Sequence, residues 1–267
     1  GILVNFYLKN GDIIEKDVSL KGGVAATVYV DKEIDLNEIE NLLKKELNNQ
    51  EVFVRKLIAL ESTKAGFLVE AGDVNADDLK NIIEEGLDVK LTDENFFFEE
   101  TGNRVGQGFY KQMVRAFILS FILMGLVIFI TYRSFVPSAA VILSVILDIL
   151  VTVAIVDLIG LRISAAGITA LLLLIGYSVD TDIILTTKMI KRKENSTWEN
   201  ILSSAKTGLT MTITTMVAVG VGAIFSKSFV LREIFIIIFI GMIVDVFSTY
   251  LMNAGLLKLY LSRKNEN

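Results

Sequence analysis

The sequence contains no cysteine and no histidine. Without cysteine, the chain has no thiol nucleophile, disulfide, zinc ribbon or iron–sulfur ligand set. Without histidine, it lacks the commonest general base and metal ligand, and every Ser-His-Asp triad is excluded. Proton chemistry is therefore left to carboxylates, lysine, tyrosine and hydroxyl groups. We predict no catalytic residue, no cofactor and no metal site.

Apolar residues, in contrast, make up 52% of the 267-residue chain and give a mean hydropathy of +0.56. Charge is unevenly distributed: residues 1–112 hold 13 basic and 22 acidic side chains, whereas residues 113–267 hold 13 and 9. An acidic module thus precedes a long apolar region that is slightly basic. The net charge of −5 argues against a nucleic-acid-binding protein, which normally carries a basic stripe.

Five apolar runs follow the acidic module, and each has about the 17–25 residues that cross the hydrocarbon core of a bilayer. They lie at 114–132, 137–158, 165–187, 207–226 and 233–256. A buried helical core of a soluble protein is the alternative, but five runs of spanning length favour a polytopic membrane protein. We predict a five-helix bundle over residues 113–258 and a cytoplasmic tail over 259–267.

Lysine and arginine predict the orientation, because they accumulate in cytoplasmic loops. The links after the first and third runs and the C-terminal end hold nine of them, against three in the other two links. We therefore predict these links and the C-terminus inside, and residues 1–112 outside, in a prokaryotic cell membrane. Because nothing in the five spans would carry the outer domain across, we expect a further spanning helix before Gly1.

Residues 1–112 alternate between the two-residue period of strands and the 3.6-residue period of helices. Helices are predicted at 36–47 behind Asp35 and at 76–85 behind Asn75. The resulting β-α-β-β-α-β order predicts an extracytoplasmic α+β domain of ferredoxin-like fold after a leading hairpin. The predicted strands lie at 2–8 and 13–20 around the Asn10-Gly11 turn, then at 24–30, 52–60 and 66–71, and last near 87–91 or 96–99.

Two short features of this domain have alternative interpretations. Gly22-Gly23 fits a tight bend at the start of a strand better than a phosphate-binding loop, because no helix follows it directly. The run Phe96, Phe97 and Phe98 fits either an apolar contact patch or packing under the sheet. Neither feature indicates an enzyme, so we expect a binding or mechanical module.

Four carboxylates fall inside the apolar runs, namely Asp148, Asp180, Asp182 and Asp245. A carboxylate at the bilayer centre costs about 2.5–3.5 kcal/mol on insertion scales. Asp180 and Asp182 are about 200° apart on an ideal helix, so we expect one to face the bundle interior and the other a neighbouring helix or a polar partner. The carboxylates are either hydrogen-bonded contacts between helices or a proton or ion relay, and all four together favour the relay.

Three threonines form a hydroxyl stripe on the fourth run, since Thr207, Thr210 and Thr214 follow helical spacing. Lys206 stands at the predicted cytoplasmic end of this stripe. Such a stripe can satisfy a carboxylate of a neighbouring helix or hold water, although threonine in spanning helices is often an ordinary packing residue. We include these four residues among the relay candidates.

The segment 147–192 closely resembles the SecF branch of the SecD/SecF protein-export family, which shares the fold of resistance-nodulation-division (RND) transporters. The stretch IGYSVDTD is similar to the family signature G-Y-S-V-N-D-T, and Leu147-Asp148 stands where members carry a His-Asp pair. TGLTMTITT at 207–215 resembles the threonine-rich helix of the family, and Gly22-Gly23 stands at the start of its outer domain. The resemblance covers the whole chain. The positions at which this sequence differs from the family motifs resemble the archaeal branch of the family.

The resemblance implies a subunit that pairs with SecD, associates with the Sec translocon channel and promotes translocation of an exported polypeptide across the lipid bilayer. It also implies one span before the outer domain and five after it, without nucleic acid as a partner. The intramembrane aspartate of the family aligns with Thr181, which lies between Asp180 and Asp182, and the basic residue of the threonine-rich helix aligns with Thr207. Thr181 therefore joins the relay candidates.

Three other classes of protein compete with this interpretation. An RND-like transporter of a small solute would need a second half-bundle, here supplied by a homodimer. An intramembrane aspartyl protease would resemble G-x-G-D, whereas this chain reads G-Y-S-V-D, and its large outer domain is foreign to that class. A structural scaffold without ion movement is the third alternative.

Overall fold

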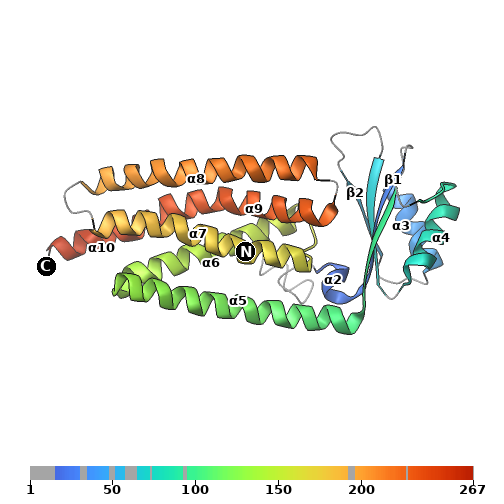
Figure 1. The fold of residues 1–267 in the computed structure, drawn as a ribbon, viewed down its shortest axis with the longest axis horizontal. Coiled ribbons are helices and arrows are strands. Elements are labelled where there is room, and N and C mark those ends of the chain that lie inside the picture. The colour runs from blue at the N-terminus through green and yellow to red at the C-terminus, as the bar shows by residue number, and fades with distance from the viewer. Residues whose placement is uncertain are drawn as a thin grey trace. The chain divides into compact units, whose positions relative to one another are not determined.

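The computed structural model describes residues 16–30, 35–47, 52–57, 65–72, 74–92, 95–191, 196–226 and 228–266 (Figure 1). These residues fall into two compact units. One, the α+β unit, comprises Lys16–Met113 and Ile163–Ala165. The other, the helical bundle, comprises Val114–Arg162 and the chain from Ala166 onward.

The α+β unit contains a four-stranded antiparallel sheet in the order β2-β3-β1-β4. This strand order, with a helix after β1 and another after β3, confirms the predicted ferredoxin-like α+β fold. Its elements are α2 (Val18–Lys21), β1 (Gly23–Val30), α3 (Leu36–Glu46), β2 (Val52–Leu57), β3 (Ala65–Ala71), α4 (Ala76–Leu87) and β4 (Phe96–Thr101).

Both long helices of this unit cover one face of the sheet, as Figure 1 shows. Alternate β1 side chains, such as Val24 and Val28, point to that face and are fully buried. They pack against apolar positions of α3 and α4, including Leu43 and Leu79. Each helix begins at a side-chain cap: Asp35 accepts from the Asn37 backbone and Asn75 accepts from the Asp77 backbone.

The start of the α+β unit differs from the sequence-based expectation. Residues 18–20, predicted as the end of a strand, form the short helix α2 together with Lys21, because Asp17 accepts the backbone N–H of Ser19 and caps the helix. Asp17 is buried, and burial raises the pKa of its carboxyl above the ordinary value of 3.8. The hydrogen bond from the Ser19 backbone and the charge of Arg55 lower this pKa, but burial has the larger effect. The rest of the predicted leading hairpin, residues 1–15, lies outside the described residues.

The bend at Gly22-Gly23 is confirmed, because both residues have positive φ, at 99° and 132°. A Cβ atom at Gly23 would lie 2.4 Å from the carbonyl oxygen of Ala71, so glycine is required where β1 meets β3. At the end of the unit, the alternative last strand at 87–91 is wrong, since α4 continues to Leu87 and the chain then turns through a left-handed Asp88.

Of the three consecutive phenylalanines, one packs under the sheet and two are exposed as an apolar patch would be. Phe96 is buried in the core, whereas Phe97 and Phe98 are 52% and 53% exposed. β4 is an edge strand, so its side chains are covered from one side only. The ring of Phe97 meets Tyr29 edge to face, with 6.3 Å between their centroids.

The bundle contains five helices long and apolar enough to cross a membrane, which confirms the predicted number among the described residues. The helices are α5 (Asn103–Tyr132), α6 (Phe135–Leu158), α7 (Ala165–Lys191), α8 (Thr197–Phe225) and α9 (Phe229–Phe247), and α9 continues through the π-helix η1 (Ser248–Asn253) into α10 (Ala254–Glu266). The fourth helix begins ten residues before the predicted 207, because Ser196 and Glu199 form a capping box.

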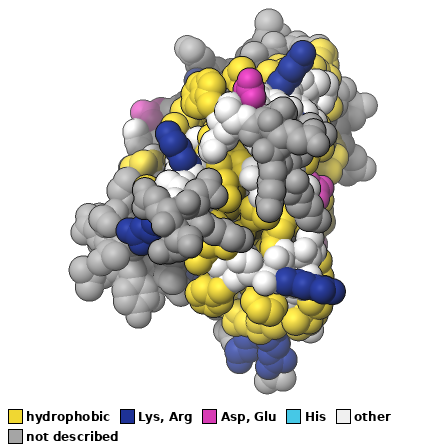
Figure 2. All heavy atoms as spheres, turned by 90° about the vertical axis from the view of Figure 1, so that its left-hand side faces the viewer, with side chains coloured by type: hydrophobic (Ala, Val, Ile, Leu, Met, Phe, Trp, Pro, Cys, Tyr) yellow, Lys and Arg dark blue, Asp and Glu magenta, His cyan; other side chains and the backbone are white. Residues whose placement is uncertain are grey.

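Burial separates the central helices of the bundle from the peripheral ones. In the most apolar stretches of α6, α7 and α9, 50%, 50% and 44% of the residues are buried, but only 6% in α5 and 11% in α8. The links after α5 and α7 and the C-terminal helix α10 lie at the same end of the bundle (Figure 1). Figure 2 views that end, where dark blue Lys and Arg side chains are spread around apolar ones; Arg133 and Lys258 are exposed.

Candidate functional site

Three of the four predicted intramembrane carboxylates converge in the middle of the bundle. Asp148 lies on α6, Asp182 on α7 and Asp245 on α9, and they are 0%, 0% and 1% exposed. They interact electrostatically with one another. We call these three residues the carboxylate cluster.

Asp148 is held by hydroxyl groups from two other helices. Ser178 on α7 donates to Asp148 Oδ2 over 2.5 Å, and Ser248 of the π-helix donates to Oδ1. Ser144, one turn before Asp148 on α6, lies 3.3 Å from Ser248 Oγ. Both oxygens of this carboxyl group are therefore satisfied without a basic residue.

Asp245 lies against two threonines. Thr181 Oγ1 is 2.9 Å and 3.1 Å from the two carboxyl oxygens of Asp245, and also 2.8 Å from the backbone carbonyl oxygen of Ser178. A hydroxyl group has a single proton, so it can donate to only one of these acceptors at a time. Thr249 Oγ1, one turn after Asp245, lies 3.3 Å from Asp245 Oδ1.

Asp182 receives both of its hydrogen bonds on one oxygen. Thr249 Oγ1 donates to Asp182 Oδ1 over 2.9 Å, and Asn253 Nδ2 donates to the same atom over 2.7 Å. The buried Asp182 Oδ2 has no hydrogen bond to any described residue. Thr249 thus bridges Asp182 and Asp245 through one hydroxyl group.

The π-helix η1 supplies three of the polar side chains that contact the cluster. Its wider turn follows directly on α9 and presents Ser248, Thr249 and Asn253, all buried, toward α6 and α7. Single π-helical turns inside longer helices are frequent at functional sites.

Sequence reasoning overlooked Ser144, Ser178, Ser248, Thr249 and Asn253. Helical spacing could have found most of them. Ser144 precedes Asp148 by four residues, Ser178 precedes Asp182 by four, and Thr249 follows Asp245 by four, so each shares a helix face with a carboxylate.

Asp180 is not part of the cluster. It is exposed on α7, while Asp182, two residues later, is fully buried. This is the division that a turn of about 200° imposes on two such residues. Asp180 therefore faces away from the core of this bundle.

Of the two roles open to the hydroxyl stripe of α8, hydrogen bonding to a neighbouring carboxylate is not seen among the described residues. Thr207, Thr210 and Thr214 are exposed, and their hydroxyl groups donate to carbonyls of α8 itself over 3.2 Å, 2.7 Å and 2.9 Å. Lys206 is exposed as well. The stripe contacts another helix through Lys188 of α7, whose Nζ lies 3.0 Å from Thr207 Oγ1. Helical periodicity correctly placed the three threonines on one face of α8, but it did not predict that this face is exposed.

The cluster has no positive partner among the described residues that hydrogen-bond to it. Three carboxylates in a water-poor interior repel one another, so they favour the binding of protons or cations. Within the described ranges, no group of three acidic side chains is spaced to hold a metal ion together. The arrangement can share protons through hydroxyl groups or hold a small cation on one carboxylate.

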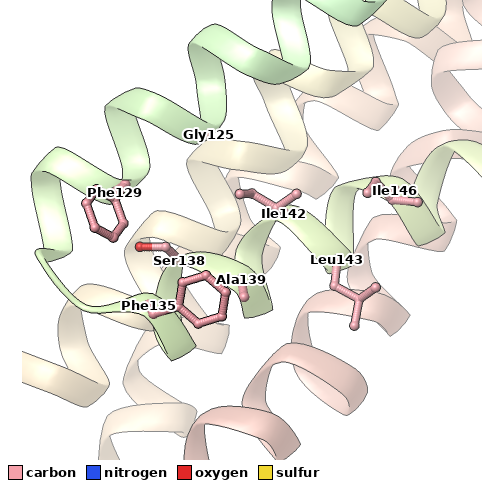
Figure 3. Close-up of a pocket in the computed structure, with 8 residues that line it drawn as sticks. All are labelled: Gly125, Phe129, Phe135, Ser138, Ala139, Ile142, Leu143 and Ile146. Atoms are coloured by element: carbon pink, nitrogen blue, oxygen red, sulfur yellow. The ribbon is translucent and has the colours of Figure 1, made fainter.

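A separate pocket of about 300 Å³ lies between α5 and α6 (Figure 3). Its lining includes Phe129, Phe135 and Ile142. The hydroxyl group of Ser138, which also lines it, donates to the backbone carbonyl oxygen of Ser134 over 2.8 Å. This pocket contains none of the predicted site residues, and its apolar lining offers no acid–base group.

Comparison with known proteins identifies the family. The family described as "Protein export membrane protein SecD/SecF, C-terminal" matches residues 84–263. The protein-export membrane protein SecF of Methanocaldococcus jannaschii is 34% identical over 256 residues, covering 93% of this chain and 88% of that protein. SecF of Pyrococcus furiosus is 33% identical over 263 residues, covering 98% and 86%.

Two solved structures share the fold. SecDF of Thermus thermophilus, described as translocon-associated, superposes with a TM-score of 0.78 at 19% identity, over 97% of this chain. A heavy metal efflux pump superposes with a TM-score of 0.51 at 12% identity, over 91% of this chain. In both cases this chain spans 36% of the solved chain.

Proposed function

The chain belongs to the SecD/SecF family of protein-export membrane proteins, and on that premise we propose that it is a SecF-type accessory subunit of the Sec export machinery. The single observation that carries the proposal is the identity with archaeal SecF proteins over more than nine tenths of this chain. The α+β unit, the five candidate spans and the carboxylate cluster are all contained in the matched length.

A SecD-type chain is the partner that this proposal requires. This chain corresponds to 36% of the SecDF chain and of the efflux-pump chain on which it superposes, which supports a second chain as its partner. Two features of the surface support an interface: Asp180 is exposed within a spanning helix, and so is the hydroxyl stripe of α8. A carboxylate facing lipid is costly, whereas one facing a second bundle is not. The translocon channel and the exported polypeptide follow as further partners of the assembled complex.

The proposed topology places the α+β unit outside the cell and the C-terminus in the cytoplasm. It is supported by the excess of Lys and Arg in the links after α5 and α7 and in α10, which share one end of the bundle. The domain limits 1–112, 113–258 and 259–267 belong to the same proposal. α10 continues helically through most of the last of these segments.

The role of the bundle in this proposal is to couple ion movement to export. Asp148, Asp182 and Asp245 join three helices through the hydroxyl groups of Ser178, Thr181 and Thr249, and binding of a proton or cation would change their mutual repulsion. A change in that repulsion shifts the packing of α6, α7 and α9. In this proposal, any mechanical action of the outer unit depends on that shift in packing. No covalent chemistry is proposed.

A second candidate function is transport of a small solute by a homodimer of this chain. The fold shared with the efflux pump favours it, although at 12% identity that likeness concerns fold alone. Affinity purification of the membrane-expressed, detergent-solubilised protein, with mass spectrometry of the bound chains, separates the two candidates. Recovery of a SecD-type chain supports the export role, whereas recovery of a homodimer alone would contradict it and support the transporter.

A further inference from the structure

Three buried oxygen atoms near the end of the carboxylate cluster have no hydrogen bond to any described residue. They are Asp182 Oδ2, Asn253 Oδ1 and Thr186 Oγ1, and all three side chains are 0% exposed. Polar groups buried without a partner are destabilising, and native proteins contain few of them. Three in one neighbourhood indicate that something else contacts them.

The three oxygens come from segments that pack against one another. Asn253 is hydrogen-bonded to Asp182 over 2.7 Å, so these two side chains are in direct contact. Thr186 follows Asp182 by one turn on α7, on the same face of the helix. Leu185 and Met189 of α7, which lie near Thr186 in the sequence, pack against α10, the helix that begins at the residue after Asn253.

The chemistry of the three atoms suits a small hard cation. Carboxylate, amide and hydroxyl oxygens are the ligands that such cations prefer. The set carries one formal negative charge, from Asp182, which a monovalent cation neutralises. Among the described residues, the donors to Asp182 are the neutral side chains of Thr249 and Asn253, so a bound cation would supply the counter-charge.

We propose that Asp182, Thr186 and Asn253 bind a sodium ion inside the bundle. This inference deepens the proposed function and rests on it, because it names the ion that would be coupled to export. Interrupted helices line the sodium sites of some transporters, and the π-helix that contributes Asn253 interrupts the regular α-helical geometry between α9 and α10.

The test uses the full chain with its co-purified partner in lipid nanodiscs. The melting temperature, Tm, is measured in NaCl, KCl and choline chloride at one ionic strength, because a ligand that binds only the folded state raises Tm. We expect a rise that saturates with NaCl and is absent in choline chloride. Equal Tm values in all three salts, or an equal rise with KCl, would overturn the sodium site.

Thr186→Val is the decisive variant because it replaces the hydroxyl with a methyl group of the same shape. If the hydroxyl is a ligand, the apparent sodium affinity falls by about tenfold or more, as in other metal sites with a damaged ligand shell. If it is only an unpaired buried group, its removal is neutral or raises Tm equally in every salt, which would overturn the proposal. Thr131→Val is the matched control, since that hydroxyl is exposed and donates to Val127 of its own helix.

Asp182→Asn provides a second variant, which keeps an oxygen for Thr249 and Asn253 but removes the charge. We expect it to abolish the sodium-dependent rise of Tm. Sodium binding and protein export are separate measurements, so the two proposals can fail independently. Absence of sodium binding, with export still dependent on the carboxylates, would overturn the sodium site and leave the export role standing.

Discussion

Asn253 of the π-helix donates a 2.7 Å hydrogen bond to Oδ1 of Asp182, a residue 71 positions earlier in the chain. This bond joins the C-terminal part of the bundle to α7 at the carboxylate cluster. Both side chains are fully buried, so water cannot replace the bond if it is lost. The π-helix is therefore part of the site and not a local irregularity.

Replacing Asn253 tests this relationship. Asn253→Ala removes a donor to a buried carboxyl group, and we expect the free energy of unfolding of the bundle to fall by about 1–3 kcal/mol. Thr131→Val, which changes an exposed hydroxyl on α5, is expected to stay within about 0.5 kcal/mol. Thermal unfolding in nanodiscs measures both. Equal stability of the two variants would show that the bond to Asp182 contributes nothing.

Asp180 is expected to serve association and not the stability of the single subunit. Because it is exposed on α7 within a spanning helix, Asp180→Asn should leave Tm of the isolated subunit unchanged. We expect the variant to bind a SecD-type partner about tenfold more weakly, which corresponds to ~1.4 kcal/mol. Titration of the tagged partner in nanodiscs measures this affinity. An unchanged affinity would remove Asp180 from the interface.

The bend before β1 gives a matched pair of glycine substitutions. Gly23→Ala should destabilise the α+β unit by about 1–3 kcal/mol, because φ is +132° and the new Cβ atom would lie 2.4 Å from the carbonyl oxygen of Ala71. Gly72→Ala should be neutral or slightly stabilising, since its Cβ atom would meet nothing within 4 Å. Pulse proteolysis of the full chain measures the stability of this unit. A Gly23→Ala protein as stable as Gly72→Ala would disprove the close approach of β1 and β3.

Asp17 predicts a pH dependence of the α+β unit. Burial raises the pKa of this carboxyl in the folded state above its ordinary value of 3.8, so the folded state binds the proton more tightly than the unfolded state. Its contribution to stability is complete below pH 3.8 and is lost as the pH rises through the folded pKa.

Asp17→Asn should remove this decline while keeping an oxygen that caps α2. Asp35→Asn is the control, because Asp35 caps α3 in the same way but is exposed. Pulse proteolysis across the acidic range compares the slopes of stability against pH. If Asp17→Asn and the unmodified chain show the same slope, the buried carboxyl of Asp17 is not its source.

Much of the fold could be predicted because it depends on local pattern. Span length and the alternation of periods in residues 24–101 identified five helices and the ferredoxin-like order. The strand expected at 18–20 failed because the cap at Asp17 outweighs an apolar alternation of so few residues. The early start of α8 depends on a capping box in a polar stretch that hydropathy does not detect.

The candidate site was predictable only in part. Burial cost identified Asp148, Asp180, Asp182 and Asp245. Helical angle predicted that Asp180 and Asp182 face different ways, but not which of them faces the core. The convergence of Asp148, Asp182 and Asp245 depends on how α6, α7 and α9 pack, which no single-helix pattern contains. The π-helix and the outward direction of Thr210 are likewise products of packing, so the sequence did not identify η1 as the source of hydroxyl partners for the carboxylates.

The most direct test of the central claim is the rate of protein export supported by Asp148→Asn, Asp182→Asn and Asp245→Asn. Each is compared with Asp35→Asn in the exposed cap of α3, after partner binding has been verified for every variant. We predict that the three cluster variants assemble normally but export about tenfold more slowly or worse, a loss of ~1.4 kcal/mol or more. Normal export by all three assembled variants would contradict the account and leave the cluster as a structural contact between helices.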